Sequence, residues 1–359
     1  MNSELVYTYF VYNTILILSA VFSFLAEYSV LKSSRIISRF LLFFILFIPA
    51  AIRYDIGTDY SNYIDLYNSL NNTPIEIGYY YINLFVHHFH LSTQWIFAIS
   101  SFITYSIVCF GLHGRFFCLT IIFYVLLLYL WSYSIIRQAI AMSFIILAMN
   151  FLIYGKNKRY FICIILATFF HYSSIILIPL FFVNKFSLNK KTIILFILCC
   201  IICIFNSFLI DFLFNSSLIT NSKYSVYLTS TYNRNTEIGS GIGVFISLLV
   251  PLASIFYYHR IIQSDNRLKG ILNMNLLYIL FYCMALNIYI FNRVSNLFSF
   301  APIMIIAPLT YVISNKKKRY ILISSFILLH VLMYEKIIFI SSKFLGEGLG
   351  ISPYTTIFN

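Results

Sequence analysis

The segment LLFFILFIPAAIRYDIGTDYSNY, residues 41–63, decides the fold class because its character changes abruptly at residue 53. Residues 41–52 carry no charged group, whereas residues 53–63 contain one arginine, two aspartates and three tyrosines. An apolar run that ends in this way predicts a membrane-spanning helix that leaves the bilayer at Arg53. The polar residues after it then form either an ordinary loop or part of a site.

The composition of the whole chain extends this interpretation to many spans. The 359 residues are 61% hydrophobic and only 10% charged, and the mean hydropathy is +0.88, far above the range of soluble domains. Apolar runs of about 17 to 25 residues recur along the chain, each long enough to cross about 30 Å of hydrocarbon as a helix. We therefore predict an all-α, polytopic integral membrane protein with one membrane domain, residues 1–359, and a first apolar run that is retained as a helix.

The distribution of lysine and arginine predicts the topology. The net charge is +13, and 17 of the 24 basic residues fall in short clusters between apolar runs, so membrane topology explains the charge and no nucleic-acid partner is expected. Placing these clusters in the cytoplasm puts both termini and the loops 53–92 and 213–240 outside. The clusters are Lys32, Arg35 and Arg39; Arg115; Lys156, Lys158 and Arg159; Lys185, Lys190 and Lys191; Arg260, Arg267 and Lys269; and Lys316, Lys317, Lys318 and Arg319. The predicted spans are 5–25, 38–52, 93–112, 116–133, 136–154, 192–212, 241–259, 270–290, 294–314 and 320–340.

Residues 160–184 lie between two cytoplasmic clusters and must therefore cross the membrane an even number of times. Twenty-five residues are too few for two full passes at 1.5 Å per residue. We expect a bent or re-entrant hairpin that turns near His171, with its non-helical backbone covered by protein or by a water-filled cavity. The alternative is one ordinary crossing, which would place the second basic cluster outside.

Three arginines far apart in the sequence, Arg53, Arg137 and Arg293, meet at the outer boundary in this topology. Each one alone is explained equally well as an arginine that marks a helix end. Together they suit a phosphate or diphosphate whose lipid tail stays in the bilayer, because the planar guanidinium binds phosphate oxygens in a bidentate fork.

Candidate acid–base residues lie near the same boundary. His171, at the expected turn of the hairpin, has an ordinary pKa near neutrality and could accept a proton, although a structural role for a lone histidine is the alternative. Asp59 and Glu76 are the candidate carboxylates. The stretch from Asp55 to Asp59 also has the composition of a turn.

Sugar contacts are assigned to the aromatic and polar residues of the same external segments. The candidates are Tyr60, Tyr63, Gln138 and Arg234, and the tyrosines equally suit an interfacial aromatic belt. The sequence contains no nucleotide-binding glycine loop, no cytoplasmic pair of aspartates and no zinc-ligand spacing, so we expect neither a cytosolic sugar nucleotide as donor nor a cofactor or metal.

Six segments in order resemble the EpsG-like family of bacterial polysaccharide polymerases, relatives of the Wzy-type O-antigen polymerases. They are RYDIGTDYSNY (53–63), EIGYYYINLF (76–85), IRQAIAMSFIILAMNFL (136–152), KNKRYF (156–161) followed by LATFFHYSS (166–174), NRVSNLF (292–298) and SPY (352–354). The resemblance runs nearly from end to end. Among the residues above it points to Arg53, Asp59, Glu76, Arg137, His171 and Arg293 as the recurrent polar positions.

The resemblance implies a glycosyltransferase of the bacterial inner membrane, with a GT-C-like architecture as one option. It would move a growing glycan from undecaprenyl diphosphate to the terminal sugar of a new lipid-linked repeat unit on the external face, for O-antigen, capsule or exopolysaccharide. A separate chain-length regulator protein would be a further partner. A ligase that uses the same donor is the nearest alternative. A flippase is less well supported, because a transporter is expected to carry internal repeats and mid-membrane charges.

Overall fold

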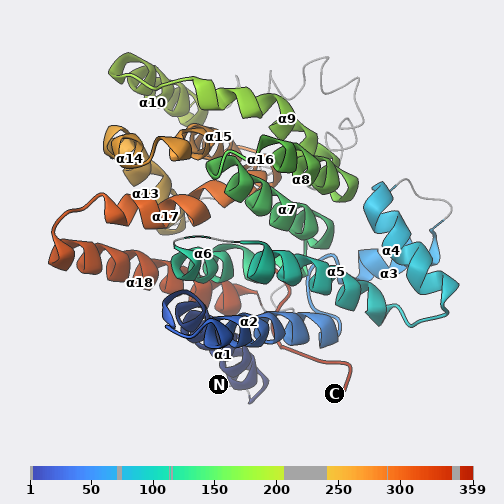
Figure 1. The fold of residues 1–359 in the computed structure, drawn as a ribbon. Coiled ribbons are helices and arrows are strands. Elements are labelled where there is room, and N and C mark those ends of the chain that lie inside the picture. Colours follow the sequence, from blue (N-terminus) through green and yellow to red (C-terminus); the bar gives the residue numbers. More distant parts are fainter. Residues whose placement is uncertain are drawn as a thin grey trace, which may run out of the picture. The chain divides into compact units, whose positions relative to one another are not determined.

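The computed structural model describes residues 3–70, 75–112, 114, 116–205, 241–288, 290–341 and 348–358. Every regular element in these ranges is a helix (Figure 1). Helices satisfy their own backbone hydrogen bonds, which a lipid environment demands. The α-helices are α1 (Ser3–Tyr28), α2 (Lys32–Ile52), α3 (Tyr60–Asn68), α4 (Ile77–His88), α5 (Gln94–Ser106), α6 (Phe117–Tyr124), α7 (Ile136–Ile153), α8 (Asn157–Phe170), α9 (Leu177–Leu180), α10 (Lys190–Phe205), α13 (Ile242–Phe256), α14 (Tyr258–Ser264), α15 (Lys269–Ala285), α16 (Ile290–Leu297), α17 (Phe300–Tyr311) and α18 (Lys316–Ile340).

The prediction of an all-helical polytopic membrane protein is confirmed, but the number of spans is lower than the predicted ten. In the described residues, six helices are long and apolar enough to cross a membrane, and the count rises to eight if each of two bent pairs is one span. The bent pairs are α13 with α14, at 65°, and α16 with α17, at 50°. The predicted span 116–133 contains a shorter apolar helix, Phe117–Tyr129, whose 13 residues reach only about 20 Å. The predicted span 192–212 runs beyond the described residues.

The described chain divides into two compact units. Unit 1 comprises Met1–Ile178 and Ser324–Asn359, and unit 2 comprises Pro179–Ile323. Of the candidate site residues that the structure describes, Arg293 belongs to unit 2 and all the others belong to unit 1. That these two units act as a single membrane domain stays a prediction.

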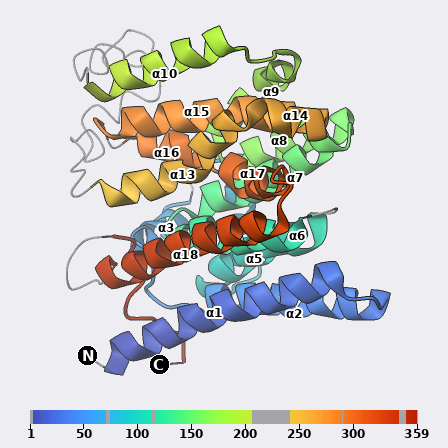
Figure 2. The same ribbon diagram turned by 90° about the vertical axis from the view of Figure 1, so that its left-hand side faces the viewer.

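Two helical hairpins organise unit 1. Helices α1 and α2 pack together and are joined by the short turn 29–31, and α7 and α8 are joined by residues 154–156 (Figure 2). The second turn contains Gly155 with φ +68°, a left-handed conformation that favours glycine at the end of a helix. Both pairs are therefore antiparallel.

Unit 1 has two chemically different ends. Helix α5 runs antiparallel to α2, because Gln94 at its start donates to the carbonyl of Arg53, whereas Arg39 donates to the carbonyl of Cys109 near its end. At that second end Gly114 packs against the Tyr154 hydroxyl at the end of α7. Six basic residues of unit 1 gather there, and we call it the basic end: Lys32, Arg35, Arg39, Lys156, Lys158 and Arg159.

The chain reverses at His171, as the sequence predicts. Helix α8 ends at Phe170, and His171 has extended backbone angles of φ −153° and ψ 106°. A 3₁₀ segment, Tyr172–Ile176, then runs back along α8, and the Tyr160 hydroxyl donates to the carbonyl of Leu177 at 2.6 Å. Since α8 starts at the basic end, His171 lies at the opposite end, which we call the site end.

A C-terminal strap, residues 348–358, closes the site end. The amides of Tyr54 and Gly57 donate to the carbonyls of Thr355 and Gly350 at 3.0 and 2.9 Å. The Tyr12 hydroxyl of α1 donates to the carbonyl of Ile351 at 2.9 Å. The strap therefore holds the loop 53–58 against α1, and both ends of the described chain lie at the site end.

Polar side chains join the helices of unit 2. The Asn275 amide of α15 donates to the Ser254 hydroxyl and to the carbonyl of Pro251 in α13, at 2.9 and 3.0 Å. The Tyr258 hydroxyl donates to the Asn273 side chain at 2.9 Å. Hydrogen bonds of this kind between buried helices replace a hydrophobic driving force that lipid cannot supply.

We predict that Gly57→Ala destabilises the protein. Gly57 has φ +103°, and a Cβ at this position would lie 2.4 Å from the carbonyl oxygen of Tyr133. Backbone strain and the clash together should cost about 3 kcal/mol or more. The measurement is the apparent melting temperature of the full chain in detergent.

The matched control is Gly155→Ala, at a glycine with φ +68° and nothing within 4 Å of the added Cβ. It should cost only about 1 kcal/mol, the penalty of the left-handed conformation alone. Equal melting temperatures for the two variants would contradict the tight packing of Gly57 on Tyr133.

Candidate functional site

Arg53 faces the interior of unit 1. Arg53 is 2% exposed, and its guanidinium donates to the carbonyls of Tyr133 and Ala50 at 3.1 and 3.4 Å. The Cζ atom also lies 4.4 Å from the Tyr133 ring centroid and 5.3 Å from that of Phe97. These contacts tie the end of α2 to the segment that leads into α7.

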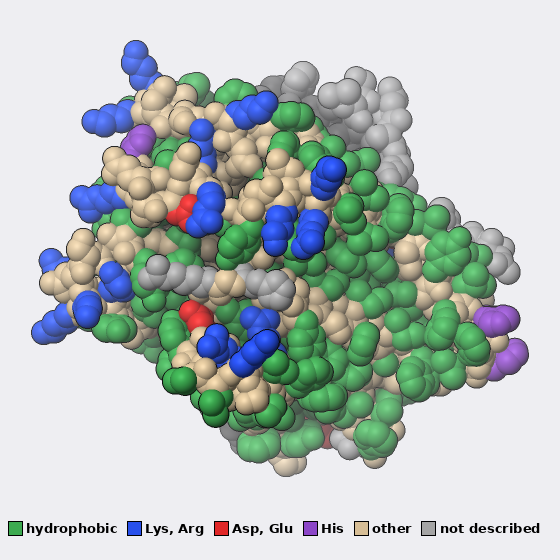
Figure 3. Space-filling view, in the orientation of Figure 1, with side chains coloured by type: hydrophobic (Ala, Val, Ile, Leu, Met, Phe, Trp, Pro, Cys, Tyr) green, Lys and Arg blue, Asp and Glu red, His purple; other side chains and the backbone are tan. Residues whose placement is uncertain are grey.

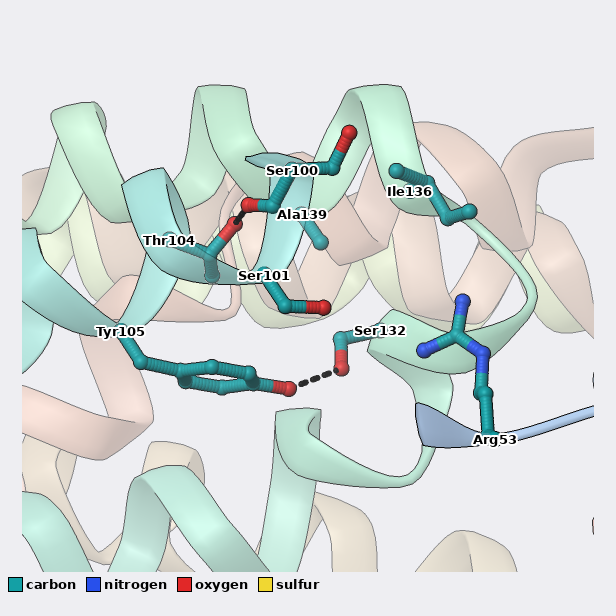
Figure 4. A pocket seen from close by; sticks show the side chains of 8 residues that line it. All are labelled: Arg53, Ser100, Ser101, Thr104, Tyr105, Ser132, Ile136 and Ala139. Carbon is teal, nitrogen blue, oxygen red and sulfur yellow. Dashed lines mark hydrogen bonds between the residues drawn. The ribbon is translucent and has the colours of Figure 1, made fainter. Parts of the chain in front are cut away.

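The space beside Arg53 is too small for a diphosphate. Figure 4 shows the guanidinium next to a cavity lined by hydroxyl groups, among them those of Ser100, Ser101 and Ser132. Its volume is about 10 Å³, room for a single water molecule. The predicted role of Arg53 in binding diphosphate therefore has no geometric support in unit 1.

Glu76 lies at the site end because α4, which it precedes, packs closely against α8. It precedes α4 as the N-cap residue, and α4 packs with its first turn against the end of α8. Gly78 permits this approach, because a Cβ there would lie 3.0 Å from the carbonyl of Phe169 and from the ring of Phe170. A larger residue would push Glu76 away from the end of α8.

Arg137 forms an ion pair with Glu76. The Arg137 Nη1 atom donates to Oε2 of Glu76, and the two side chains are 32% and 10% exposed. Arg137 lies in the first turn of α7, in a helix whose remaining residues are uncharged. A charge-assisted hydrogen bond of this kind fixes the guanidinium while one side of it stays accessible to solvent.

His171 lies on the other oxygen of the same carboxylate. Its Nδ1 atom is 3.8 Å from Oε1 of Glu76, and its side chain is 27% exposed. Glu76, Arg137 and His171, brought together from α4, α7 and the turn after α8, form what we call the carboxylate-centred cluster.

The environment keeps Glu76 ionised. Burial alone would raise the pKa of Glu76, but the neighbouring His171 side chain and the positive charge of Arg137 outweigh it, and the pKa is lowered from its ordinary value of 4.5. A carboxylate with a lowered pKa is a weak proton acceptor. Glu76 is therefore better suited to orient its two partners than to abstract a proton.

Two tyrosines form an aromatic wall behind Arg137. The rings of Tyr63 and Tyr79 each lie 6.0 Å from the Arg137 Cζ atom, and both residues are buried. Burial raises the pKa of the Tyr63 hydroxyl, and the Arg137 charge offsets part of that shift. Tyr79 was not among the predicted residues, although its spacing of three from Glu76 places both on one face of α4.

The remaining candidates of unit 1 lie around this cluster. Asp59 is the N-cap residue of α3, and its carbonyl accepts from the Tyr63 amide one turn later. Tyr60 is 5% exposed and stacks on Phe97 with ring centroids 4.4 Å apart. Gln138 is buried beside Arg137 on α7. Tyr60 and Tyr63 therefore belong to the packed core, and neither offers a free face to a sugar.

Two candidates lie elsewhere. Arg293 is on α16 in unit 2, and Arg234 lies outside the described residues. Among the described residues no group of three or more His, Cys, Asp or Glu side chains could hold a metal ion.

We predict that Glu76→Gln weakens the structure by about 2 kcal/mol at neutral pH, because it leaves the partly buried Arg137 without its counter-charge. The lowered pKa fixes the sign of the pH dependence. The contribution of Glu76 is fully present above the ordinary pKa of 4.5 and disappears as the pH falls through the lower folded-state value. Melting temperatures of wild type and variant should therefore converge in acid.

Asp265→Asn provides the control, since Asp265 pairs with Arg267 within one exposed loop. A surface pair of this kind contributes about 1 kcal/mol or less. A loss of stability as large as that of Glu76→Gln would show that the Glu76–Arg137 pair contributes no more than a surface ion pair.

The sequence pattern of the EpsG family matches residues 36–356 of this chain, a range that contains all three residues of the carboxylate-centred cluster and most of the C-terminal strap. No curated protein and no solved structure matches the chain. The family match agrees with the multi-pass helical fold. The chain thus belongs to the EpsG family, a family of polysaccharide polymerases.

Proposed function

We propose that this protein polymerises lipid-linked oligosaccharide repeat units on the external face of the bacterial inner membrane. The donor is a growing glycan on undecaprenyl diphosphate, and the acceptor is the terminal sugar of a new lipid-linked repeat. The observation that carries the proposal is the carboxylate-centred cluster, which combines an arginine that we assign to anion binding with a candidate base at the site end of unit 1, opposite the basic end. The positive-inside bias puts the basic end in the cytoplasm and the cluster outside.

In this proposal Arg137 binds the diphosphate of the donor. Its Nη1 is occupied by Glu76, and the aromatic wall supports its other side, so the guanidinium is held in place before substrate arrives. When the bond from the anomeric carbon to the diphosphate breaks, negative charge develops on the leaving oxygen. A prepositioned guanidinium stabilises that charge without reorganisation.

His171 accepts the proton of the attacking hydroxyl. Because its Nδ1 faces Glu76, Nε2 is the nitrogen that meets substrate. The hydroxyl oxygen of the acceptor sugar forms a bond to the anomeric carbon, its proton passes to Nε2, and undecaprenyl diphosphate departs. The carboxylate of Glu76 then stabilises the imidazolium, as an orienting carboxylate does beside a catalytic histidine.

The other candidates receive supporting roles. Asp59, one turn before the aromatic wall, is the second carboxylate available to a sugar hydroxyl, and Arg293 and Arg234 are further cations for the donor. Gln138 borders the cluster on α7. Arg53 is assigned to holding the loop 53–58 and not to the diphosphate, because of its burial. The reaction needs no cofactor, and a GT-C-like arrangement of the helices remains part of the proposal.

We expect Arg137→Ala to abolish polymerisation. In a strain that lacks the gene, surface glycan should collapse from a ladder to single repeat units, and wild type but not the variant should restore the ladder. Loss of one charge-stabilising donor costs about 100-fold or more in rate. Arg137→Lys should recover little, since lysine lacks the bidentate fork.

Arg159→Ala is the matched control, an exposed arginine at the basic end of the same helical hairpin. At equal expression it should give a normal ladder. A normal ladder with Arg137→Ala would refute the mechanism. Loss of polymer attached to its final acceptor, with the lipid-linked ladder intact, would identify a ligase, and loss of repeat units at the outer face would identify a flippase.

We expect His171→Gln to lower the rate by about 10² to 10⁴-fold while binding of the lipid diphosphate is retained. The measurement is the turnover of purified protein with a synthetic lipid-linked repeat, alongside donor binding by the same sample. A turnover of His171→Gln equal to that of wild type would assign the base to another residue.

A further inference from the structure

A second charged pocket lies at the basic end of unit 1, at the other end of α2 from Arg53. It has a volume of about 330 Å³, within the range of small-molecule sites. Helix α2 has 21 residues and spans about 30 Å, so this pocket is remote from the carboxylate-centred cluster. Its lining comprises Ala26, Glu27, Lys32, Arg35, Ile36, Arg39, Gly114 and Phe117.

The two arginines of the pocket are fixed in place by backbone carbonyls. Arg39 donates from Nη1 to the carbonyls of Cys109 and Leu112 at 2.8 and 2.9 Å, and its Cζ lies 4.1 Å from the ring centroid of Phe117. Arg35 donates from Nε and Nη2 to the carbonyls of the α1–α2 turn at 2.9 and 3.3 Å. Each guanidinium keeps further N–H donors, so the donors are oriented before a ligand binds.

The one carboxylate in the pocket is already engaged. Glu27 accepts from the amides of Phe116 and Cys118 at 3.2 and 2.7 Å, and so it caps the start of α6. The ion pairs found in the described part of the chain involve other residues than Lys32, Arg35 and Arg39. Three cations therefore face the pocket against one carboxylate, which is a surplus of positive charge.

An apolar rim adjoins the cations of the pocket. Ile36 lines the pocket and is 46% exposed, and Val30 and Leu31, in the turn whose carbonyls Arg35 binds, are 91% and 68% exposed. In Figure 3, Lys and Arg side chains lie over this turn with an acidic side chain beside them, next to hydrophobic side chains. Exposed apolar residues around fixed cations suit a ligand that has both a charged group and hydrocarbon chains.

We propose that this pocket binds the phosphate group of an anionic membrane phospholipid. The phosphate lies between Lys32, Arg35 and Arg39, and the acyl chains run along the apolar surface of α1 and α2. Planar guanidinium groups match phosphate oxygens, and basic pockets between membrane helices collect such headgroups. The site is independent of the polymerisation reaction, because it lies at the opposite end of α2 from the cluster.

The test counts lipids bound to the full chain in detergent by native mass spectrometry. The protein is titrated with phosphatidylglycerol or with phosphatidylcholine of the same acyl chains. Wild type should prefer phosphatidylglycerol, and the double variant Lys32→Gln with Arg35→Gln should lose about 25-fold in affinity for it, at about fivefold per charge. Binding of phosphatidylcholine should not change.

Two further variants keep the outcome decisive. Lys32→Arg with Arg35→Lys preserves both charges and should retain most of the preference. Lys156→Gln with Lys158→Gln removes two exposed charges from the same end without touching the pocket, and should change affinity less than about threefold. Retention of the preference in Lys32→Gln with Arg35→Gln, or an equal loss in Lys156→Gln with Lys158→Gln, would overturn the proposal.

A final titration distinguishes the lipid from soluble phosphate, which carries the same phosphate group. Inorganic phosphate added to the titration should leave phosphatidylglycerol bound, because the lipid also gains from the apolar rim. Displacement of the lipid by inorganic phosphate would make a soluble phosphate compound the ligand and would overturn the lipid as its source.

Discussion

The site end of unit 1 depends on one constraint: the backbone of an irregular loop beside apolar helices must find hydrogen-bond partners other than water. Loop 53–58 leaves α2 without continuing as a helix, and its partners come from far away in the sequence. The strap supplies carbonyls to Tyr54 and Gly57, and the Ser134 hydroxyl accepts from the Thr58 amide while it donates to the carbonyl of Leu349. Burial of the Arg53 guanidinium on the Tyr133 carbonyl completes the same network.

The carboxylate-centred cluster is built on this frame. Tyr133 and Ser134, which hold the loop, immediately precede the first turn of α7 and therefore set the position of Arg137. Glu76 contacts Arg137 and His171, which lie at the two ends of the same hairpin of α7 and α8, and Gly78 allows the approach that makes this contact. A single acidic side chain thus contacts both the arginine that we propose as the diphosphate ligand and the histidine that we propose as the base, and its own ionised state is a product of their proximity.

Sequence reasoning succeeded where hydrophobicity and chain length decide the outcome. Helical spans follow from apolar runs, and the reversal at His171 follows from 25 residues between two basic clusters. It overestimated the number of spans, because residues 116–133 are apolar but form only a short helix before the chain turns toward α7. A run of apolar residues does not show where a helix ends when it contains no proline, glycine or charged residue at that position.

The directions in which the side chains point do not follow from the sequence. Arg53 and Arg137 look alike in sequence, each at the outer end of an apolar span, yet one guanidinium turns into the core and the other pairs with Glu76 at the surface. The difference arises from carbonyls and a carboxylate supplied by distant segments, which no local pattern encodes. The sequence likewise does not distinguish Tyr60 and Tyr63 from exposed interfacial tyrosines. In the structure their rings pack on Phe97 and Tyr79.

The strap also sets an order of events during biosynthesis. Tyr54 and its partner Thr355 are 301 residues apart, so α1, α2 and the loop enter the membrane long before the residues that close them are made. The ribosome must translate past residue 355 before the site end is finished. A truncated product that inserts its helices normally would carry Glu76, Arg137 and His171, but it would lack the hydrogen bonds that fix the adjoining loop.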